Sequence, residues 1–350
     1  MTSKPGSWIA LSATALLLMS ACGGARQADD AGAEAGGGDG DSFTIKFSHV
    51  VTEQTPKGQA AEKFKEIVEA ETDGGVSVEI YPNSSLYGDK DELQALQSDA
   101  VQMLAPSGAK FSTVAPQLQV LDLPYIVESP EQMPEVFNPD TVVGQAIYEN
   151  EDLKGLGIKV LGLWDNGIKH VSSNHEMHDP SDLAGLTFRI QSSDILRSMI
   201  EAWGGTGTPM SFSEVYTSLQ QGVIDAQENT YSSMESQKMH TVQDYIAETN
   251  HGYVGYILVI DQDFFDSLPA DYQEAVLKAA EESTAYNREI AAQFNADSKQ
   301  AIIDAGTTEI IELTDEESQA FEDAVVPSVW KEYEDVVGPE IIEELLANRE

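Results

Sequence analysis

Positively charged side chains are the scarce chemical groups of this sequence. Lys and Arg together number 19, against 60 Asp and Glu, and five residues are arginines. Arg189 lies in the segment LTFRI at 186–190, where residue types alternate as in a half-buried strand. The QSS segment that follows favours the start of a helix. Open α/β sheets bind ligands at such strand ends, beside helix N-termini, and a guanidinium there offers a two-pronged fork for a carboxylate.

Two interpretations of Arg189 stay open at this point. The residue clamps a carboxylate ligand, or it forms a structural ion pair with one of the many acids, and its position in the sequence favours neither. Lys169, in the segment WDNGIKH at 164–170, also follows an apolar strand pattern, but taken alone it has the pattern of an exposed lysine. Arg197 and Arg288 are flanked by acids on predicted helices, which is typical of surface ion pairs.

Motifs for catalysis are missing from the sequence. It contains no phosphate-binding GxxxxGK[ST] loop, no GxGxxG after a strand and no GxSxG nucleophile turn. His175 and His178 do not have the spacing of a HExxH zinc site and lie in a polar segment. Acidic pairs are so numerous that they are typical of solvated faces rather than of an acid–base couple. We therefore expect no enzymatic activity, no metal and no cofactor.

The N-terminus has the pattern of a cleaved and lipidated leader. Residues 8–19 are mainly apolar, and the small residues Ser20 and Ala21 precede Cys22. The apolar run is too short for a comfortable membrane span, which favours a signal peptide over residues 1–21. Lipid on Cys22 would anchor the chain, and the Gly-rich, acidic segment 22–42 would be a flexible tether. The alternative is an ordinary secretory signal followed by a cysteine of no special role.

Composition excludes several classes of protein. The formal net charge of −41 argues against a nucleic-acid partner and against adhesion to anionic lipid through basic residues. A single cysteine rules out an internal disulfide framework and Cys-rich metal sites. The hydrophobic fraction of 41% is enough for a packed core, and 350 residues favour two domains. We therefore expect membrane contact only through the lipid.

Hydrophobic periodicity predicts alternating strands and helices after residue 42. The predicted strands span 43–47, 76–80, 101–105, 158–164, 186–190, 223–226 and 253–260. The predicted helices begin at Thr55-Pro56, Asp89, Ser192 or Ser193, Ser211–Glu214, Pro269 and Thr314–Glu317. This alternation is typical of an α/β fold with a mostly parallel sheet.

Longer segments carry a family resemblance. These are FSHVVTEQTPKGQAAEKFKE, VEIYPNSSLYGDKDELQALQ, VLDLPYI, LWDNGIKH, DLAGLTFRIQSSDIL, TPMSFSEVYTSLQQGVIDAQENTYS and the Asn250-His251 pair. Over residues 43–335 the chain resembles the solute-binding proteins of tripartite ATP-independent periplasmic (TRAP) transporters. The combination of FRIQSSD, Lys169 and QENT is similar to the branch that binds four-carbon (C4) dicarboxylates.

The resemblance implies a set of ligand-binding residues. Arg189 would clamp a ligand carboxylate, Asn229 would hydrogen-bond it, Lys169 would be a second cation, and Phe212 would pack on the ligand. Four further residues fall at pocket-lining positions: His49, Ser107, Ser192 and His251. Tyr125 and Tyr231, with Phe212, are candidates to cover the apolar middle of a dicarboxylate.

The resemblance also implies a fold and a role. The fold is α/β and two-lobed, like a periplasmic binding protein, with a hinge and a long helix joining the lobes. By pattern, the first lobe comprises 43–165 and 255–294, and the second 166–254 and 295–350. The implied protein is an extracytoplasmic lipoprotein that captures succinate, malate or fumarate and delivers it to the TRAP membrane permease. One alternative keeps this role with a sugar acid or another carboxylate as the ligand, and another is a lipid-anchored hydrolase.

Overall fold

The structure is a computed structural model that describes residues 42–127 and 129–347. The predicted signal peptide, Cys22 and the predicted tether as far as residue 41 lie outside the described residues. Within the two described ranges, every helix is either too short or too polar to serve as a membrane span.

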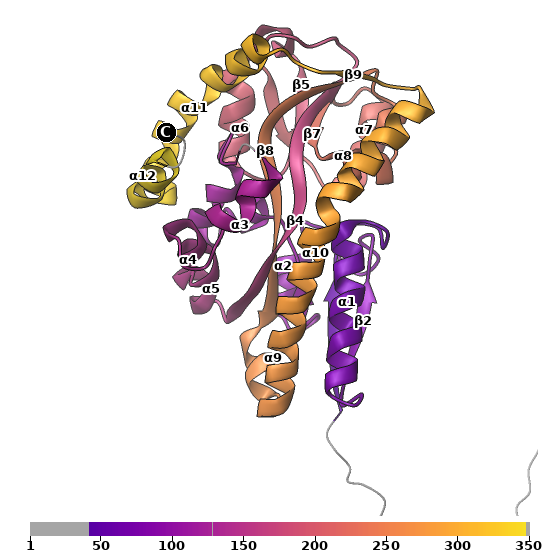
Figure 1. Cartoon of the computed structure of the whole chain (residues 1–350), viewed down its shortest axis with the longest axis vertical. Helices are drawn as coiled ribbons and strands as arrows, with labels where there is room; N and C mark the ends of the chain where they lie inside the picture. The colour runs from indigo at the N-terminus through magenta and orange to yellow at the C-terminus, as the bar shows by residue number, and fades with distance from the viewer. Residues whose placement is uncertain (1–41, 128, 348–350) are drawn as a thin grey trace, which may run out of the picture. The chain divides into compact units, whose positions relative to one another are not determined.

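The described residues form one nine-stranded sheet (Figure 1). Its order is β2-β1-β3-β8-β4-β7-β5-β6, and β9 pairs with β8. The strands are β1 Phe43–Ser48, β2 Val76–Tyr81, β3 Met103–Leu104, β4 Ile158–Ser173, β5 Thr187–Ile190, β6 Thr206–Pro209, β7 Ala226–Asn229, β8 Tyr245–Asp261 and β9 Glu309–Ile311.

The sheet is mixed, so the prediction of a mostly parallel sheet is wrong for its centre. β1 pairs in parallel with β2 and β3, and β5 pairs in parallel with β6 and β7. Between these flanks, β3, β8, β4 and β7 pair antiparallel. The alternation of strands and helices predicts parallel pairing within each flank, but it gives no signal for the strands that join the flanks.

The joining strands β4 and β8 are far longer than the strands predicted at 158–164 and 253–260. They pair along their whole length, with three shifts of register along the ladder. Such bulges let a strand bend while its pairing continues. Gly167, at the second shift, has φ +123°, which other residues rarely adopt, and a Cβ there would lie 2.8 Å from Nδ2 of Asn295. Residues 165–170 are therefore strand, and they lie where the two flanks meet.

The helices begin largely where their capping residues predict. They are α1 Pro56–Glu71, α2 Glu92–Gln97, α3 Met133–Val136, α4 Val142–Tyr148, α5 Glu151–Gly155, α6 Asp194–Ala202, α7 Val215–Gln220, α8 Tyr231–Ser236, α9 Gln262–Ser267, α10 Ala270–Ala305, α11 Asp315–Val337 and α12 Pro339–Ala347. The hydroxyls of Thr55 and Ser193 each accept a bond from a backbone N–H of the first turn, and Thr314 forms a capping box with Glu317.

The predicted helix start at Asp89 is wrong, because α2 begins three residues later. The Asp89 carboxylate forms an ion pair with Lys110 at 2.7 Å and accepts a hydrogen bond from the Phe212 backbone N–H at 3.3 Å. A carboxylate engaged in this way does not cap α2, which has no side-chain cap.

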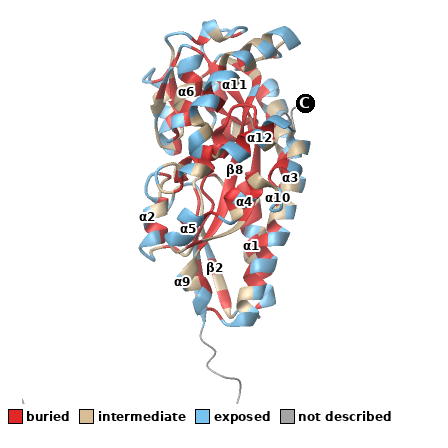
Figure 2. Ribbon diagram, turned by 90° about the vertical axis from the view of Figure 1, so that its left-hand side faces the viewer, coloured by how far each residue is buried: buried red, intermediate tan, exposed pale blue. Residues whose placement is uncertain are grey.

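The long helix α10 holds the middle of β4 in place. It follows Pro269, as predicted, and ends before Gly306, whose φ of +64° is the left-handed conformation that commonly terminates helices. Asn295 donates to the Asn166 carbonyl at 2.7 Å, and the Asp165 N–H donates to Asn287 at 2.5 Å. Figure 1 shows α10 beside β4 and α1, and Figure 2 shows buried residues concentrated around β8.

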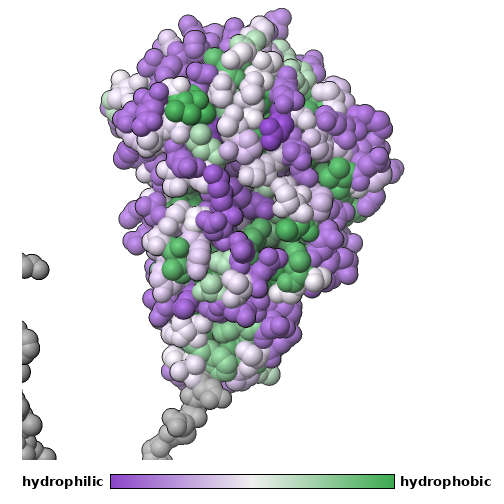
Figure 3. Space-filling view, turned by 180° about the vertical axis from the view of Figure 1, so that it is seen from behind, coloured by the Kyte–Doolittle hydropathy of each residue, from purple (hydrophilic) through white to green (hydrophobic). Residues whose placement is uncertain are grey.

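Two large apolar clusters pack against the sheet, and one of them, which includes Leu104 and Phe188, extends across both flanks. Phe47, Phe64 and Trp164 belong to one cluster, and Trp203 and Phe321 belong to another. Hydrophilic side chains cover most of the face in Figure 3, and the hydrophobic residues on it are scattered.

Candidate functional site

A small cavity of about 30 Å³ lies between residues that precede β4 in the chain and residues that follow it. Its lining residues are Val50, Val51, Asp89, Glu92, Ser107, Lys110, Arg189, Gln191, Phe212, Asn229, Ser233, Val254 and Tyr256. Four of the predicted site residues are therefore brought together here: Arg189, Asn229, Phe212 and Ser107. They come from β5, from β7, from the turn before α7 and from the loop after β3.

Arg189 is positioned by β5 and held by a single bond. Its side chain is 1% exposed, and its Nε donates to the Met210 carbonyl at 3.1 Å. The guanidinium lies 5.8 Å from the ring centroid of Phe212. Among the described residues, none forms an ion pair with Arg189, so the structural ion pair considered from the sequence is not observed. Burial lowers the pKa of Arg189, whereas Asp89 and Glu228 raise it, and a guanidinium stays charged.

Asn229 and Ser107 supply polar groups from opposite sides of the cavity. Asn229, at the end of β7, accepts a bond from the Thr230 N–H at 3.1 Å, and its Nδ2 has no partner among the described residues. Ser107 accepts a bond from Gln191 at 2.8 Å and forms an isolated bridge with Tyr256. A donor and a hydroxyl therefore converge beside the guanidinium.

Lys169 lies one layer behind the cavity lining. Its Nζ is 2.8 Å from Oε2 of Glu228, and both side chains are almost fully buried. His251 approaches the same Glu228 oxygen at 3.4 Å and contacts the Thr249 hydroxyl at 2.7 Å through its Nδ1. Burial alone would raise the pKa of Glu228, but Lys169 and then His251 outweigh it and lower this pKa to about 2. Glu228 is therefore ionised and neutralises Lys169.

The remaining predicted residues are not in the cavity lining. His49 is fully buried, neither ring nitrogen has a hydrogen-bond partner among the described residues, and burial, with Lys57, lowers its pKa to about 3. Ser192 is exposed, and its carbonyl accepts a bond from Ser112. Neither Tyr125 nor Tyr231 lines the cavity. Tyr125 donates to the Thr249 carbonyl, and Tyr231 donates to Glu248.

Three lining residues could not be predicted from the sequence as part of the site: Asp89, Glu92 and Lys110. Lys57 is a further buried charge beside them. Lys110 and Asp89 form a pair whose side chains are only 7% and 4% exposed. Glu92 is 2% exposed and lines the cavity. Lys57 is fully buried, donates to the Ala105 carbonyl at 3.0 Å and lies 3.6 Å from the Tyr256 ring centroid. The sequence shows these residues only as charges in helical or polar segments, which are usually exposed.

A larger pocket of about 430 Å³ lies elsewhere. Ile168 and His170, the neighbours of Lys169 in β4, line it, and successive strand residues point to opposite faces. Its cation, Arg288, is 3.6 Å from Asp165, which also accepts a bond from Tyr253 at 2.5 Å. Because that cation already faces a carboxylate, the smaller cavity around Arg189 is the better anion site.

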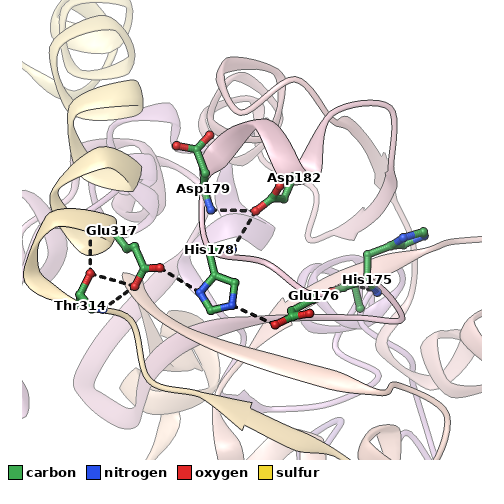
Figure 4. Close-up of polar contacts among 8 residues, drawn as sticks. His175, Glu176, His178, Asp179, Asp182, Thr314 and Glu317 are labelled. Carbon is green, nitrogen blue, oxygen red and sulfur yellow. Dashed lines mark hydrogen bonds and ion pairs between the residues drawn. The ribbon is translucent and has the colours of Figure 1, made fainter.

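The histidine pair of the 174–182 segment is a surface contact. Figure 4 shows His178 between Glu176 and Glu317, at 3.1 Å and 2.9 Å, while the ring of His175 points away. Hydrogen bonds with Glu176 and then Glu317 raise the pKa of His178. Among the described residues, no group of three or more His, Cys, Asp or Glu side chains could hold a metal ion.

Comparison with known proteins assigns the chain to a family. The model of the family described as bacterial extracellular solute-binding protein, family 7, matches residues 47–335. The chain belongs to this family. A family 7 relative, the C4-dicarboxylate-binding periplasmic protein DctP of Rhodobacter capsulatus, is 46% identical over 301 residues, which are 86% of this chain and 89% of that protein.

Two solved structures share the fold. A TRAP periplasmic solute-binding protein of Shewanella oneidensis, solved with bound succinate, has a TM-score of 0.84 and 40% identity and covers 88% of this chain and 100% of its own. A TRAP periplasmic solute-binding protein of Pseudomonas aeruginosa PAO1, solved with bound L-malate, has a TM-score of 0.80 and 37% identity. The match covers 83% of this chain and 100% of that chain. The predicted resemblance and the two-lobed α/β fold class are confirmed. Family 7 is a family of extracytoplasmic solute-binding proteins.

Proposed function

We propose that the protein captures a C4-dicarboxylate, such as succinate, malate or fumarate, in the cavity around Arg189. The observation that carries this proposal is a buried guanidinium that lines a cavity and has no carboxylate partner among the described residues. A buried charge without a counterion is unfavourable, and a ligand carboxylate would supply the counterion. A dicarboxylate in particular is supported by the C4-dicarboxylate-binding relative and by the two similar structures, which hold succinate and L-malate.

The second carboxylate of the ligand would face Lys110. Lys110 and Arg189 are the two cations of the cavity lining, and they come from different flanks of the sheet. Lys169, which is not in the cavity lining, would support the wall through its ion pair with Glu228 and not bind the ligand directly. His251 would act in the same layer. A dianion that bridges the two flanks would favour the closed arrangement over an open one.

Closure would bring together the two lobes expected from the sequence. One lobe is 43–165 with 255–294, and the other is 166–254 with 295–350. β4, β8 and α10 run through both ranges, so they would form the hinge. The register shifts and Gly167 in β4 support this assignment, because they interrupt the ladder where the lobes would meet.

The closed protein would deliver its ligand to a TRAP membrane permease. Lipid on Cys22 would keep it at the membrane surface, and the segment 22–42 would set its reach. The leader sequence and the family support this part of the proposal.

A thermal-shift screen of organic acids tests the proposed function. A ligand present at 1,000 times its Kd stabilises the folded protein by about 4 kcal/mol, which is a shift of many degrees in melting temperature. Succinate, malate and fumarate should raise it, and their monoamides should raise it less. A larger shift with galacturonate or glucuronate than with any C4-dicarboxylate would favour a sugar acid as the ligand. No shift with any carboxylate would refute the proposal.

A further inference from the structure

The acids around the cavity differ in how they are paired. Asp89 is bound to Lys110 and to the Phe212 N–H. Glu228, behind the lining, is bound to Lys169 and His251. Glu92 lines the same cavity as Arg189, yet its carboxylate has no hydrogen bond or ion pair with any described residue.

The neighbours of Glu92 come from five segments. They are Lys57 of α1, Asp89 of the loop before α2, Lys110 of the 3₁₀ turn Gly108–Phe111, Arg189 of β5 and Tyr256 of β8. Among the charged neighbours, Lys57 has the largest electrostatic effect on Glu92. Its Nζ donates to the Ala105 carbonyl and lies over the Tyr256 ring. Burial raises the pKa of Tyr256, so its phenol stays neutral. Lys57 and Glu92 thus form a desolvated pair of opposite charges that lack a direct ion pair.

A dicarboxylate in this cavity would add two negative charges beside Glu92. The lining holds two cations, Lys110 and Arg189, and two acids, Asp89 and Glu92, so it has no net charge when all four groups are ionised. Like charges in a site that excludes water cannot all stay ionised. Asp89 is held ionised by Lys110, and Glu92 is the acid without such a partner.

We propose that the Glu92–Lys57 pair takes up one proton when a dicarboxylate enters the cavity, so that ligand binding is linked to protonation. This inference rests on the proposed function and adds a residue that sets its pH dependence. The proton comes from solvent and neutralises the Glu92 carboxylate, while the bound dianion holds Lys57 in its charged form. A protonated Glu92 also turns from an acceptor into a donor toward the ligand.

The pKa values of Glu92 and Lys57 in the ligand-free protein agree with a carboxylate that lacks an ion-pair partner. Burial, with a smaller contribution from Asp89, raises the pKa of Glu92 to about 7, against the opposing effect of Lys57 and Lys110. Burial lowers the pKa of Lys57 to about 8. A bound dianion raises both values, so the bound pair holds more protons than the free pair between pH 7 and 9. Affinity should therefore fall as pH rises in this window, by up to about tenfold per pH unit for each proton taken up.

Calorimetry measures the linkage directly. Succinate is titrated into the purified protein at pH 8, where both of its carboxyl groups are ionised, in phosphate and in Tris, whose ionisation heats differ. We expect an uptake of about one proton for each succinate bound. The double variant Lys57→Met/Glu92→Gln should bind succinate with no uptake and a flat pH profile. Asp91→Asn, which removes an exposed acid next to Glu92, should leave the uptake unchanged.

Three results overturn the inference. The first is normal succinate binding with equal heats in both buffers and a constant affinity from pH 7 to 9, which leaves the proposed function intact. The second is undiminished uptake in the double variant or, if that variant does not fold, in both single variants. The third is loss of uptake in Asp122→Asn, because burial raises the pKa of Asp122 to about 6. Absence of binding by every C4-dicarboxylate would instead refute the proposed function.

Discussion

Replacing Arg189 with lysine should separate ligand binding from folding. The side chain is 1% exposed, and one bond, from Nε to the Met210 carbonyl, is its hydrogen-bonded link to the described residues. Lysine keeps the charge but cannot form two parallel N–H bonds to a carboxylate. Arg189→Ala removes the charge as well and would leave a desolvated ligand carboxylate without its partner.

The magnitude follows from this burial. Truncating one member of a buried, hydrogen-bonded charge pair costs about 2–4 kcal/mol of binding, which is about 30- to 1000-fold in Kd. We expect Arg189→Lys in this range and Arg189→Ala beyond it. Stability of free Arg189→Lys should change little, because the lost Met210 bond is worth about 1 kcal/mol. In Arg189→Ala, removal of an unpaired buried charge also offsets this loss.

Isothermal titration with succinate and thermal unfolding of the free protein together test this reasoning. Arg197→Lys is the matched control, because Arg197 lies on α6, is 42% exposed and is 3.9 Å from Asp194. It should bind succinate like the unmodified protein. A large fall in the melting temperature of free Arg189→Lys, together with native affinity in the folded fraction, would refute the account, since Arg189 would then be structural.

Four further predictions concern other parts of the molecule. Lys110→Met should weaken succinate binding at least about tenfold more than binding of its monoamide, whereas equal losses for the two ligands would remove Lys110 from the site. Glu228→Gln should lower the free energy of unfolding by about 3–5 kcal/mol, because it leaves Lys169 buried without a partner. An effect no larger than that of the exposed control Glu176→Gln would contradict this. The folded-state pKa of Glu228 is lowered from 4.5 to about 2. The contribution of the Glu228 ion pairs to stability is therefore complete above pH 4.5 and is lost as the pH falls toward 2. Acid unfolding of Glu228→Gln and Glu176→Gln checks this pH dependence. Succinate should reduce the radius of gyration measured by X-ray scattering, and an unchanged profile at saturation would count against lobe closure. Cys22→Ser should move the protein from the membrane to the soluble fraction in cell fractionation, and retention in membranes would contradict the lipid anchor.

Local signals in the sequence are enough for several helix starts and for the position of Arg189. Thr55, Ser193 and Thr314 are capping residues whose effect spans one turn of helix, so neighbouring residues decide it. Arg189 follows from a short alternating strand and the helix start after it. Such features need no knowledge of distant parts of the chain.

The rest depends on partners that are distant in sequence. The full lengths of β4 and β8 arise from their mutual antiparallel pairing, which the periodicity of either strand alone does not show. Lys169 has the sequence pattern of an exposed lysine, and only the pairing of β4 with β7 brings Glu228 to it. Glu92 is buried because α2 begins at the polar cavity, and Lys57 because it faces the Ala105 carbonyl and the Tyr256 ring, burials that residue type alone argues against.

The most direct test of the central claim is a crystal structure of the protein grown with succinate. We expect one succinate carboxylate to accept two bonds from the Arg189 guanidinium, at about 2.7–2.9 Å, and the other to face Lys110. Succinate bound instead in the pocket beside Asp165 and Arg288, or an Arg189 side chain turned to a carboxylate of the protein, would contradict the account.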